Sequence, residues 1–599
     1  MRNSRQTILP HALHSHHRFL LTLQIKNHLH SLALSPPNNH QQTKMTLPKP
    51  PSLSLLFLLL LGAAHAEDPY HFHTWNVKYA TLSPLGSPEQ VITINDEFPG
   101  PRINGTSNNN IVVNIFNHLD EPVLFTWNGI QQRKNSWQEG LPGTNCPIPP
   151  GTNMTYKFQV KDQIGSYYYY PSTSLHRATG GYGPITVHSR ELIPVPYAFP
   201  EAEHIALVGD WYTKPLPDLL KLLDSGRSLG RPDGVVINGK SGKIEKKPNH
   251  KEEPMFTMLP GKTYRYRFCN VGMKNSINIR FQKHSIKLVE IEGSHTVQNI
   301  YDSLDVHLGQ CYSVLVTADQ EPGDYYLIAS TRFTKEVLSA TALVRYVGGK
   351  APPPAEMPAP PVGWAWSLNQ FRSQRWNLTA SAARPNPQGS YHYGKINITR
   401  TIKVVNSAGA VDGRLRYAIN GVSHVNPETP LKLAEYFRVA DKVFKYNLMK
   451  DYPGQAGEKI TVAPDVVNAT YRDFIEIVFE NPEKSVQSWH LAGYSFFAVA
   501  IEPGKWTPAR RSNYNLLDAV SRNTIQVYPG CWAAIMLTMD NAGMWNLRAG
   551  STERAYLGQQ LYFSVLSREL SLRDEYNIPD DQLLCGIVKD MPRPKLYTI

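Results

Sequence analysis

Histidine side chains are the groups in this sequence best suited to metal binding or acid–base chemistry, and His490 stands in the most informative stretch. It lies in QSWHLAGYSFFAV, residues 487–499, among aromatic and apolar neighbours. Imidazole is the commonest metal ligand in proteins and titrates near neutral pH. A lone histidine on a strand is more often a hydrogen-bonded or surface residue than a ligand. The other histidines that could contribute to a metal site are His71, His73, His176 and His188.

The cysteine pattern predicts disulfides and disfavours a zinc site. All five cysteines follow residue 66, and none forms a C-x-x-C pair. An odd number of cysteines in an exported chain leaves one thiol unpaired. The sequence also lacks the H-E-x-x-H motif of zinc metalloproteases. The five cysteines are Cys146, Cys269, Cys311, Cys531 and Cys585.

Residues 45–66 have the pattern of a secretory signal peptide. Lys49 supplies a positive charge, residues 53–61 form an apolar run, and A-H-A at 64–66 is a small-residue cleavage motif. The run is too short to span a membrane. Because such a signal stands at the start of a chain, we expect residues 1–44 to be a spurious or disordered extension. A dual-targeting extension is the alternative.

Removal of the leader changes the charge. Residues 1–66 hold six basic residues and no acid, so the formal net charge falls from +12 to +6. A mildly basic surface suits an acidic polysaccharide or is simply solvated, and nothing indicates nucleic-acid binding. The C-terminus has no apolar tail, which argues against a GPI anchor. Sequons predict glycosylation of surface loops at Asn104, Asn153, Asn377, Asn397 and Asn468.

Length and patterning predict an all-β protein of three domains, at about 100–200 residues per domain. Apolar content of 41% and charged content of 18% suit a globular chain with sizeable cores. Few helices are expected, at 217–223 and 430–437, each with a proline near its start. Strand-like runs in the first domain are 70–79, 90–95, 111–116, 123–127, 155–160 and 166–170.

One pattern occurs three times. A glycine turn, an alternating strand, a polar turn and a second glycine precede an aromatic strand, with glycines at 151 and 165, 309 and 323, and 530 and 543. The repeat predicts the same hairpin in three homologous β-domains. We expect domains at 67–190, 191–347 and 364–599, with a stiff Pro-rich linker at 348–363.

Four segments resemble the copper-binding segments of plant multicopper oxidases, of which ascorbate oxidase is the nearest active relative. In order they are LFTWNGIQQRKNSWQEG (124–140), GSYYYYPSTSLHRATGGYG (165–183), the stretch at 487–499, and NAGMWNLRAGSTERAYLG (541–558). The resemblance spans the whole mature chain and implies three consecutive cupredoxin-like Greek-key sandwich or barrel domains. It also implies a blue copper held by two imidazoles and a thiolate, and a cluster held by eight imidazoles in four H-x-H pairs.

Most of the ligand positions that this resemblance implies hold other residues. The family's first two H-x-H pairs correspond to Thr126 with Asn128 and Tyr170 with Ser172. Only one of ten imidazoles remains, His490, and the thiolate is absent. The other positions are Gln487 and Arg554 (blue-copper imidazoles), Ala492, Arg548 and Gly550 (cluster imidazoles), Ala549 (thiolate) and Gln559 (near the axial ligand).

The replacements predict a polar or anion-accepting pocket where the cluster would lie. Arg548 and Arg554 are permanently cationic and cannot donate a lone pair. Two such charges need acceptors or solvent; the partners we expect are Gln487, Tyr170 and Asn128. A dispersed loss of ligands with no new role is the alternative. A copper site rebuilt from the remaining histidines is disfavoured, and no cofactor is expected.

The match is closest to one subgroup. The runs EDPYHFHTWNV, KNSW, CPIPPG, GSHTVQNIYDSLD and AARPNPQGSYHYG resemble the pollen-specific ascorbate oxidase homologues, within the skewed-growth group of plant cell-wall proteins. That resemblance implies a secreted wall glycoprotein acting in pollen or pollen-tube growth. It also implies a Cys146–Cys585 disulfide; Cys269 and Cys311 form a second expected pair, leaving Cys531.

Two functions remain to be weighed. The favoured one is a non-redox protein of the apoplast that binds a wall polysaccharide, a wall protein or a small ligand. The alternative is a copper-dependent oxidase of the ascorbate oxidase type acting through a remodelled site. Coordination chemistry favours the first, because a cluster cannot assemble from one imidazole.

Overall fold

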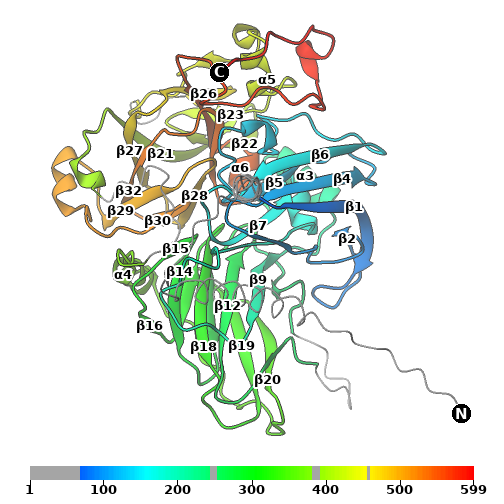
Figure 1. The fold of residues 1–599 in the computed structure, drawn as a ribbon, viewed down its shortest axis with the longest axis vertical. Helices are drawn as coiled ribbons and strands as arrows, with labels where there is room; N and C mark the ends of the chain where they lie inside the picture. The colour runs from blue at the N-terminus through cyan, green and yellow to red at the C-terminus, as the bar shows by residue number, and fades with distance from the viewer. Residues whose placement is uncertain (1–67, 243–252, 381–391, 455–458) are drawn as a thin grey trace, which may run out of the picture. The chain divides into compact units, whose positions relative to one another are not determined.

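A computed structural model describes residues 68–242, 253–380, 392–454 and 459–599. The predicted signal peptide and the extension before it lie outside the described residues. The described residues form one unit whose regular structure is mostly β-strands, with few helices. Its strands make three successive pairs of sheets, which Figure 1 shows in blue and cyan, in green, and in yellow to red.

The first pair of sheets has four strands each. One sheet runs β2-β1-β4-β6 and the other β3-β8-β7-β5. The strands are β1 Tyr70–Leu82, β2 Glu89–Ile94, β3 Ile103–Thr106, β4 Asn110–Asn117, β5 Phe125–Asn128, β6 Asn153–Gln159, β7 Gly165–Pro171 and β8 Gly183–His188.

The second pair holds the orders β10-β9-β12-β18-β14-β15, with β16 beside β14, and β11-β20-β19-β13-β17. Its strands are β9 Glu203–Trp211, β10 Gly234–Ile237, β11 Phe256–Met258, β12 Thr263–Asn270, β13 Ile277–Phe281, β14 Ile286–Ile291, β15 Ser294–His295, β16 Ile300–Tyr301, β17 Leu304–Val306, β18 Cys311–Thr317, β19 Asp324–Thr331 and β20 Ser339–Tyr346.

The third pair holds the orders β25-β23-β22-β21-β27-β32-β29-β30 and β24-β26-β34-β33-β28-β31. Its strands are β21 Arg400–Val411, β22 Arg414–Ile419, β23 Val422–His424, β24 Lys445–Tyr446, β25 Thr461–Ala463, β26 Asp465–Thr470, β27 Phe474–Asn481, β28 Gln487–Leu491, β29 Phe496–Pro503, β30 Ser521–Arg522, β31 Thr524–Val527, β32 Cys531–Thr538, β33 Gly543–Ala549 and β34 Gln560–Leu566.

Strand order confirms the predicted threefold repeat. The core of one sheet reads β2-β1-β4-β6, β10-β9-β12-β18 and β22-β21-β27-β32, with a parallel central pair each time. The other sheet reads β3-β8-β7-β5, β11-β20-β19-β13 and β26-β34-β33-β28, and its first pair is always parallel. Three copies of one mixed sandwich topology agree with the expected cupredoxin-like fold, while the domain boundaries stay predictions.

The hairpin assigned to the repeat is wrong. β6 and β7 lie in different sheets, and so do β18 and β19, and β32 and β33. Each glycine-bounded turn therefore carries the chain from one sheet of a sandwich to the other. Alternation shows that two strands are half-buried, but it does not show which sheet each strand joins.

Helices are few, as expected. Both predicted helices exist, although Pro430 is the residue before α5 and Pro217 lies in the first turn of α3. The sequence reading missed α4 and α6. The α-helices are α3 Leu216–Asp224, α4 Trp364–Ser373, α5 Leu431–Tyr436 and α6 Thr552–Tyr556. The 3-10 helices are η1 Ser136–Gln138, η2 His176–Thr179, η3 Tyr393–Lys395, η4 Ala440–Lys442, η5 Pro508–Asn513 and η6 Gly586–Val588.

Both expected disulfides are present. Cys146 and Cys585 are joined with their Cα atoms 6.0 Å apart, which ties the C-terminal segment to the first domain. Cys269 and Cys311 are directly opposite each other on β12 and β18 and are bonded with a Cα separation of 4.1 Å. Cys531 keeps a free, buried thiol.

Candidate functional site

Strand pairing brings the four segments of interest into two pairs of facing strands. Thr126 on β5 faces Tyr170 on β7, and His490 on β28 faces Arg548 on β33. Hydrogen bonds from Arg548 then join the two pairs, one of which belongs to the first domain and the other to the third. Positions far apart in the sequence thus meet in one place, as the resemblance implies.

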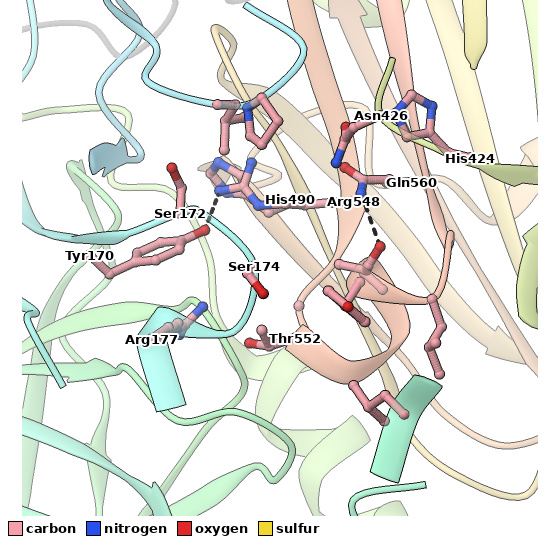
Figure 2. A pocket seen from close by; sticks show the side chains of 18 of the residues that line it. Tyr170, Ser172, Ser174, Arg177, His424, Asn426, His490, Arg548, Thr552 and Gln560 are labelled. Atoms are coloured by element: carbon pink, nitrogen blue, oxygen red, sulfur yellow. Dashed lines mark hydrogen bonds between the residues drawn. The ribbon is translucent and has the colours of Figure 1, made fainter. Parts of the chain in front are cut away.

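The residues at the implied ligand positions form two groups. Arg548 is the centre of the first group, which stands at the copper-cluster positions. Its Nη2 donates to the Tyr170 hydroxyl at 2.9 Å (Figure 2). Nη2 also donates to Asn128 Oδ1 at 3.1 Å, and Nη1 donates to Asn546 Oδ1 at 3.3 Å. The residue is 7% exposed. The expected partners Tyr170 and Asn128 are therefore correct, and the hydrogen bonds hold a cation in place.

A second buried guanidinium lies beside the same tyrosine. Arg177, in η2, sits over the Tyr170 ring with its Cζ 4.4 Å from the ring centroid. Its Nη2 donates to Tyr168 at 3.2 Å and its Nε to the Val271 carbonyl at 3.1 Å. Figure 2 shows both guanidinium groups beside Tyr170. Arg177 was not predicted as a site residue, although it stands next to His176 in the second segment.

Glu139 is a buried acid close to Arg548 that the sequence reading also missed. Thr126 Oγ1 donates to Glu139 Oε1 at 3.5 Å, while Oε2 is buried without a hydrogen-bond partner among the described residues. Burial raises the pKa of Glu139 to about 8, against the opposing effects of Arg548 and Thr126. The carboxyl is therefore protonated near neutral pH and leaves the charge of Arg548 uncompensated.

His490 is neutral at the pH of most solutions. Burial and, second, the charge of Arg548 hold its pKa well below the ordinary value. Its Nδ1 lies 3.5 Å from Thr524 Oγ1. A neutral imidazole is able to bind a metal, but the residue opposite His490 on β33 is the cation Arg548.

Arg554 is the centre of the second group, at the blue-copper positions. It forms an ion pair with Glu483, and its Nη1 donates to Gln559 Oε1 at 3.2 Å. Gln487 is not its partner as expected; Gln487 Nε2 donates instead to Ser485 at 3.0 Å, which Arg554 Nη2 approaches at 3.4 Å. Glu483, which no motif marked, neutralises this arginine.

The remaining predicted positions line or support the two groups. Ser172 donates to the Gly140 carbonyl at 2.5 Å, and the Gly550 amide donates to the Ser488 carbonyl at 2.6 Å. Ala492 and Ala549 are buried and bring no donor atom beyond the backbone. The structure therefore gathers the predicted residues, with polar and small side chains where the family places ligands.

A cavity of about 330 Å³ opens onto the first group. Its inner wall includes Tyr170, Arg177, His490 and Arg548. Ser174 and Thr552 also line it, and Figure 2 labels both among its polar side chains. A space of this size is at the small end of pockets that take organic ligands.

The donor set does not fit the copper sites that the resemblance implies. One imidazole, His490, stands among those positions, and the side chain nearest to it in the neighbouring strand carries a positive charge. Blue copper needs two imidazoles and a thiolate. The described residues contain no group of three or more His, Cys, Asp or Glu side chains placed to hold a metal ion.

The other histidines do not gather into a site. His71 Nε2 bonds Asn109 at 2.8 Å and His188 Nε2 bonds Asn104 at 2.8 Å, while His176 Nε2 lies 3.1 Å from the Glu121 carboxylate. Each has its own local partner, as a lone histidine commonly does. His73 is half-buried on β1, two residues from His71.

The sequons differ from the expected loops. Asn104, Asn153 and Asn468 lie in β3, β6 and β26, whereas Asn377 and Asn397 lie outside strands. Asn377 is half-buried and the other four are exposed.

The described residues include no helix with the length and apolar character needed to cross a membrane.

Comparison with known proteins identifies the relatives. Three family models, each described as "Multicopper oxidase", match residues 76–192, 202–349 and 428–571. An "L-ascorbate oxidase homolog" of Brassica napus is 68% identical over 531 residues, covering 88% of this chain and 95% of that protein. The "Monocopper oxidase-like protein SKU5" of Arabidopsis thaliana is 45% identical over 562 residues, covering 91% and 94%.

Solved structures agree on the fold. The chain is similar to the crystal structure of "Fet3p, a Multicopper Oxidase that Functions in Iron Import", with a TM-score of 0.71 and 18% identity. That match covers 86% of this chain and 93% of the other. At such low identity the likeness concerns the fold alone.

Proposed function

Since the chain belongs to the multicopper oxidase family, we propose a function that uses the family's fold without its copper chemistry. The protein is a secreted, non-redox component of the plant cell wall or apoplast. It acts in the growth of pollen or the pollen tube, in line with its resemblance to the pollen-specific subgroup. Its binding partner is a wall polysaccharide, a wall protein or a small apoplastic ligand.

The observation that carries this proposal is the place of Arg548. The guanidinium occupies a position that corresponds to a cluster ligand and is held there by Tyr170 and Asn128, which replace two more ligands. A fixed positive charge repels a copper dication and donates no lone pair. At these three ligand positions the chain therefore has a hydrogen-bonded cation and its two partners in place of metal-binding imidazoles.

The same arrangement supports the binding of an anion. Arg548 and Arg177 both line the cavity, and neither forms an ion pair with a carboxylate among the described residues. Buried cations need an acceptor of negative charge or solvent. An anionic group entering the cavity would meet charge-assisted donors, which are stronger than neutral ones.

Secretion is supported by the leader pattern at 45–66, by two disulfides, and by four exposed sequons. Many relatives carry oxidase in their names, but a shared fold does not transfer an activity. Function must follow from the residues at the site, and these residues favour binding.

Oxygen consumption tests the proposal against the oxidase alternative. The mature protein, purified in the presence of excess copper and then freed of loosely bound metal, is assayed with ascorbate and with phenols. A Cucurbita maxima L-ascorbate oxidase, which is 27% identical to this chain, serves as the positive control. We expect no turnover above the buffer; sustained turnover proportional to protein would establish the copper-dependent alternative.

A further inference from the structure

We propose that the cavity binds a small ligand carrying two separated carboxylates, one held by an inner pair of arginines and one by a rim pair. The inner pair is Arg177 and Arg548, and the rim pair is Arg414 and Arg416; all four line the same cavity. This inference rests on the proposed non-redox function and names the ligand class for that site.

The inner pair is prepared to receive an anionic group. Arg177 and Arg548 are 6% and 7% exposed, and hydrogen bonds to Tyr168, Tyr170 and Asn128 fix their orientation. Fixed guanidinium groups lose little conformational freedom on binding, and their planar forks match a carboxylate. Protonation of Glu139 keeps this buried acid, which interacts electrostatically with Arg548, from competing with a bound anion.

The rim pair stands at the mouth of the same cavity. Arg414 and Arg416 start β22, after a tight turn in which Asp412 and Gly413 have φ values of 49° and 74°. Two residues apart on a strand, their side chains project from the same face. Arg414 is exposed and Arg416 half-buried, so this pair is nearer to solvent than the inner pair.

Negative charge is scarce in the cavity wall. Asp224 is the one carboxylate among its described lining residues, and it accepts a hydrogen bond from the Tyr556 hydroxyl at 3.4 Å. Neither rim arginine forms an ion pair with another described residue. Four arginines against one acid give the cavity a positive potential, which attracts anions and raises their rate of association.

Arg554, in contrast to the cavity arginines, has its positive charge neutralised by another residue of the protein. Glu483 pairs with it, and Tyr417 lies against its guanidinium with the Cζ 4.3 Å from the ring centroid. The former blue-copper position is therefore closed by an internal ion pair. The arginines of the cavity lack such a partner, which points to an external one.

The other residues that line the cavity fit a ligand with a body of mixed polarity. Leu223, Leu415 and Leu557 supply apolar contacts, while Ser174 and Thr552 supply hydroxyl groups. The hydroxyl of Thr552 is buried without a hydrogen-bond partner among the described residues. A buried, unpaired hydroxyl is costly unless a ligand or a water completes it.

Isothermal titration of the mature full chain tests the inference. The probes are acetate, inorganic phosphate, a series of linear dicarboxylates of increasing length, and trigalacturonate, so that free dicarboxylic acids and the end of an acidic polysaccharide are distinguished. Each is titrated into wild type, into R414Q/R416Q, and into the surface control K505Q/R510Q. We expect one dicarboxylate or the trimer to bind roughly tenfold more tightly than acetate.

The rim variant decides whether two sites act together. R414Q/R416Q should remove the roughly tenfold advantage of the dianion and leave the affinity for acetate unchanged, while the control matches wild type. R548K, which keeps the charge but loses the planar fork, should weaken every anion. Equal affinity for acetate, for every dicarboxylate and for trigalacturonate, or no effect of R414Q/R416Q, would overturn the two-carboxylate inference. A copper-free protein that binds no anion overturns it while leaving the non-redox function standing, and stoichiometric copper overturns both.

Discussion

Replacing Glu139 with glutamine should change how the stability of the protein responds to pH. In the folded state burial raises the pKa of this carboxyl from 4.5 to about 8. Between those pH values the folded state holds a proton that the unfolded state has released. The free energy of unfolding therefore falls as the pH rises. Glutamine cannot titrate, so E139Q lacks this loss.

The size of the effect follows from the pKa change. A rise from 4.5 to about 8 corresponds to roughly 5 kcal/mol over the whole window and roughly 3 kcal/mol at pH 7. These are upper bounds, since water entering the site would reduce them. Glutamine has nearly the shape of the protonated acid and still accepts from Thr126. At pH 5 we therefore expect E139Q and wild type to differ by less than about 1 kcal/mol.

The assay is denaturant unfolding of both proteins at pH 5, 6, 7 and 8. Other buried acids with raised pKa values, such as Glu292 and Asp465, titrate in both proteins and cancel in the difference. E569Q, at an exposed carboxyl, serves as the control and should follow wild type. The variant should become progressively more stable than wild type as the pH rises. Parallel curves would show that Glu139 is ionised beside Arg548 and would refute the uncompensated charge.

Three further predictions concern the Cys146–Cys585 disulfide, the free thiol of Cys531 and the ion pair of Arg554. C146S/C585S should lose up to about 6 kcal/mol of stability, because the bond closes a loop of 439 residues; thermal unfolding measures the loss, and an unchanged Tm would contradict it. Thiol titration should find one reactive group, Cys531, and only after denaturation; reaction in the folded protein would show that the thiol is accessible. R554M should destabilise the protein by about 1–3 kcal/mol, because it leaves the Glu483 carboxylate unpaired. R554M/E483Q should recover most of that loss, and a double variant no better than R554M would refute the pairing.

Much of the fold could be predicted because its threefold repeat depends on local sequence patterns. Glycine turns and alternating strands recur at nearly equal spacing, and the three sandwiches do share one strand order. The assignment of β6 and β7 to a hairpin failed for a physical reason. Burial on one face makes both strands alternate, whether or not they pair with each other.

The site was predicted where a family pattern fixed the position and was missed where partners are distant in sequence. Tyr170, Asn128 and Arg548 were expected together, and they meet. Glu139 and Arg177 carry no signal of their own, since the role of each depends on a charge or a ring brought near by the fold. For the same reason Gln487 was expected as a polar partner of Arg554, whereas its ion pair with Glu483 was not predicted.

The most direct test of the non-redox account is the copper content of the mature protein together with its visible absorption spectrum. The protein should be exposed to copper, dialysed and measured per mole of chain. The account predicts far less than one copper per chain and no blue absorption, because Arg548 and Arg554 stand at ligand positions and no thiolate is present there. Stoichiometric copper with a blue band would contradict it.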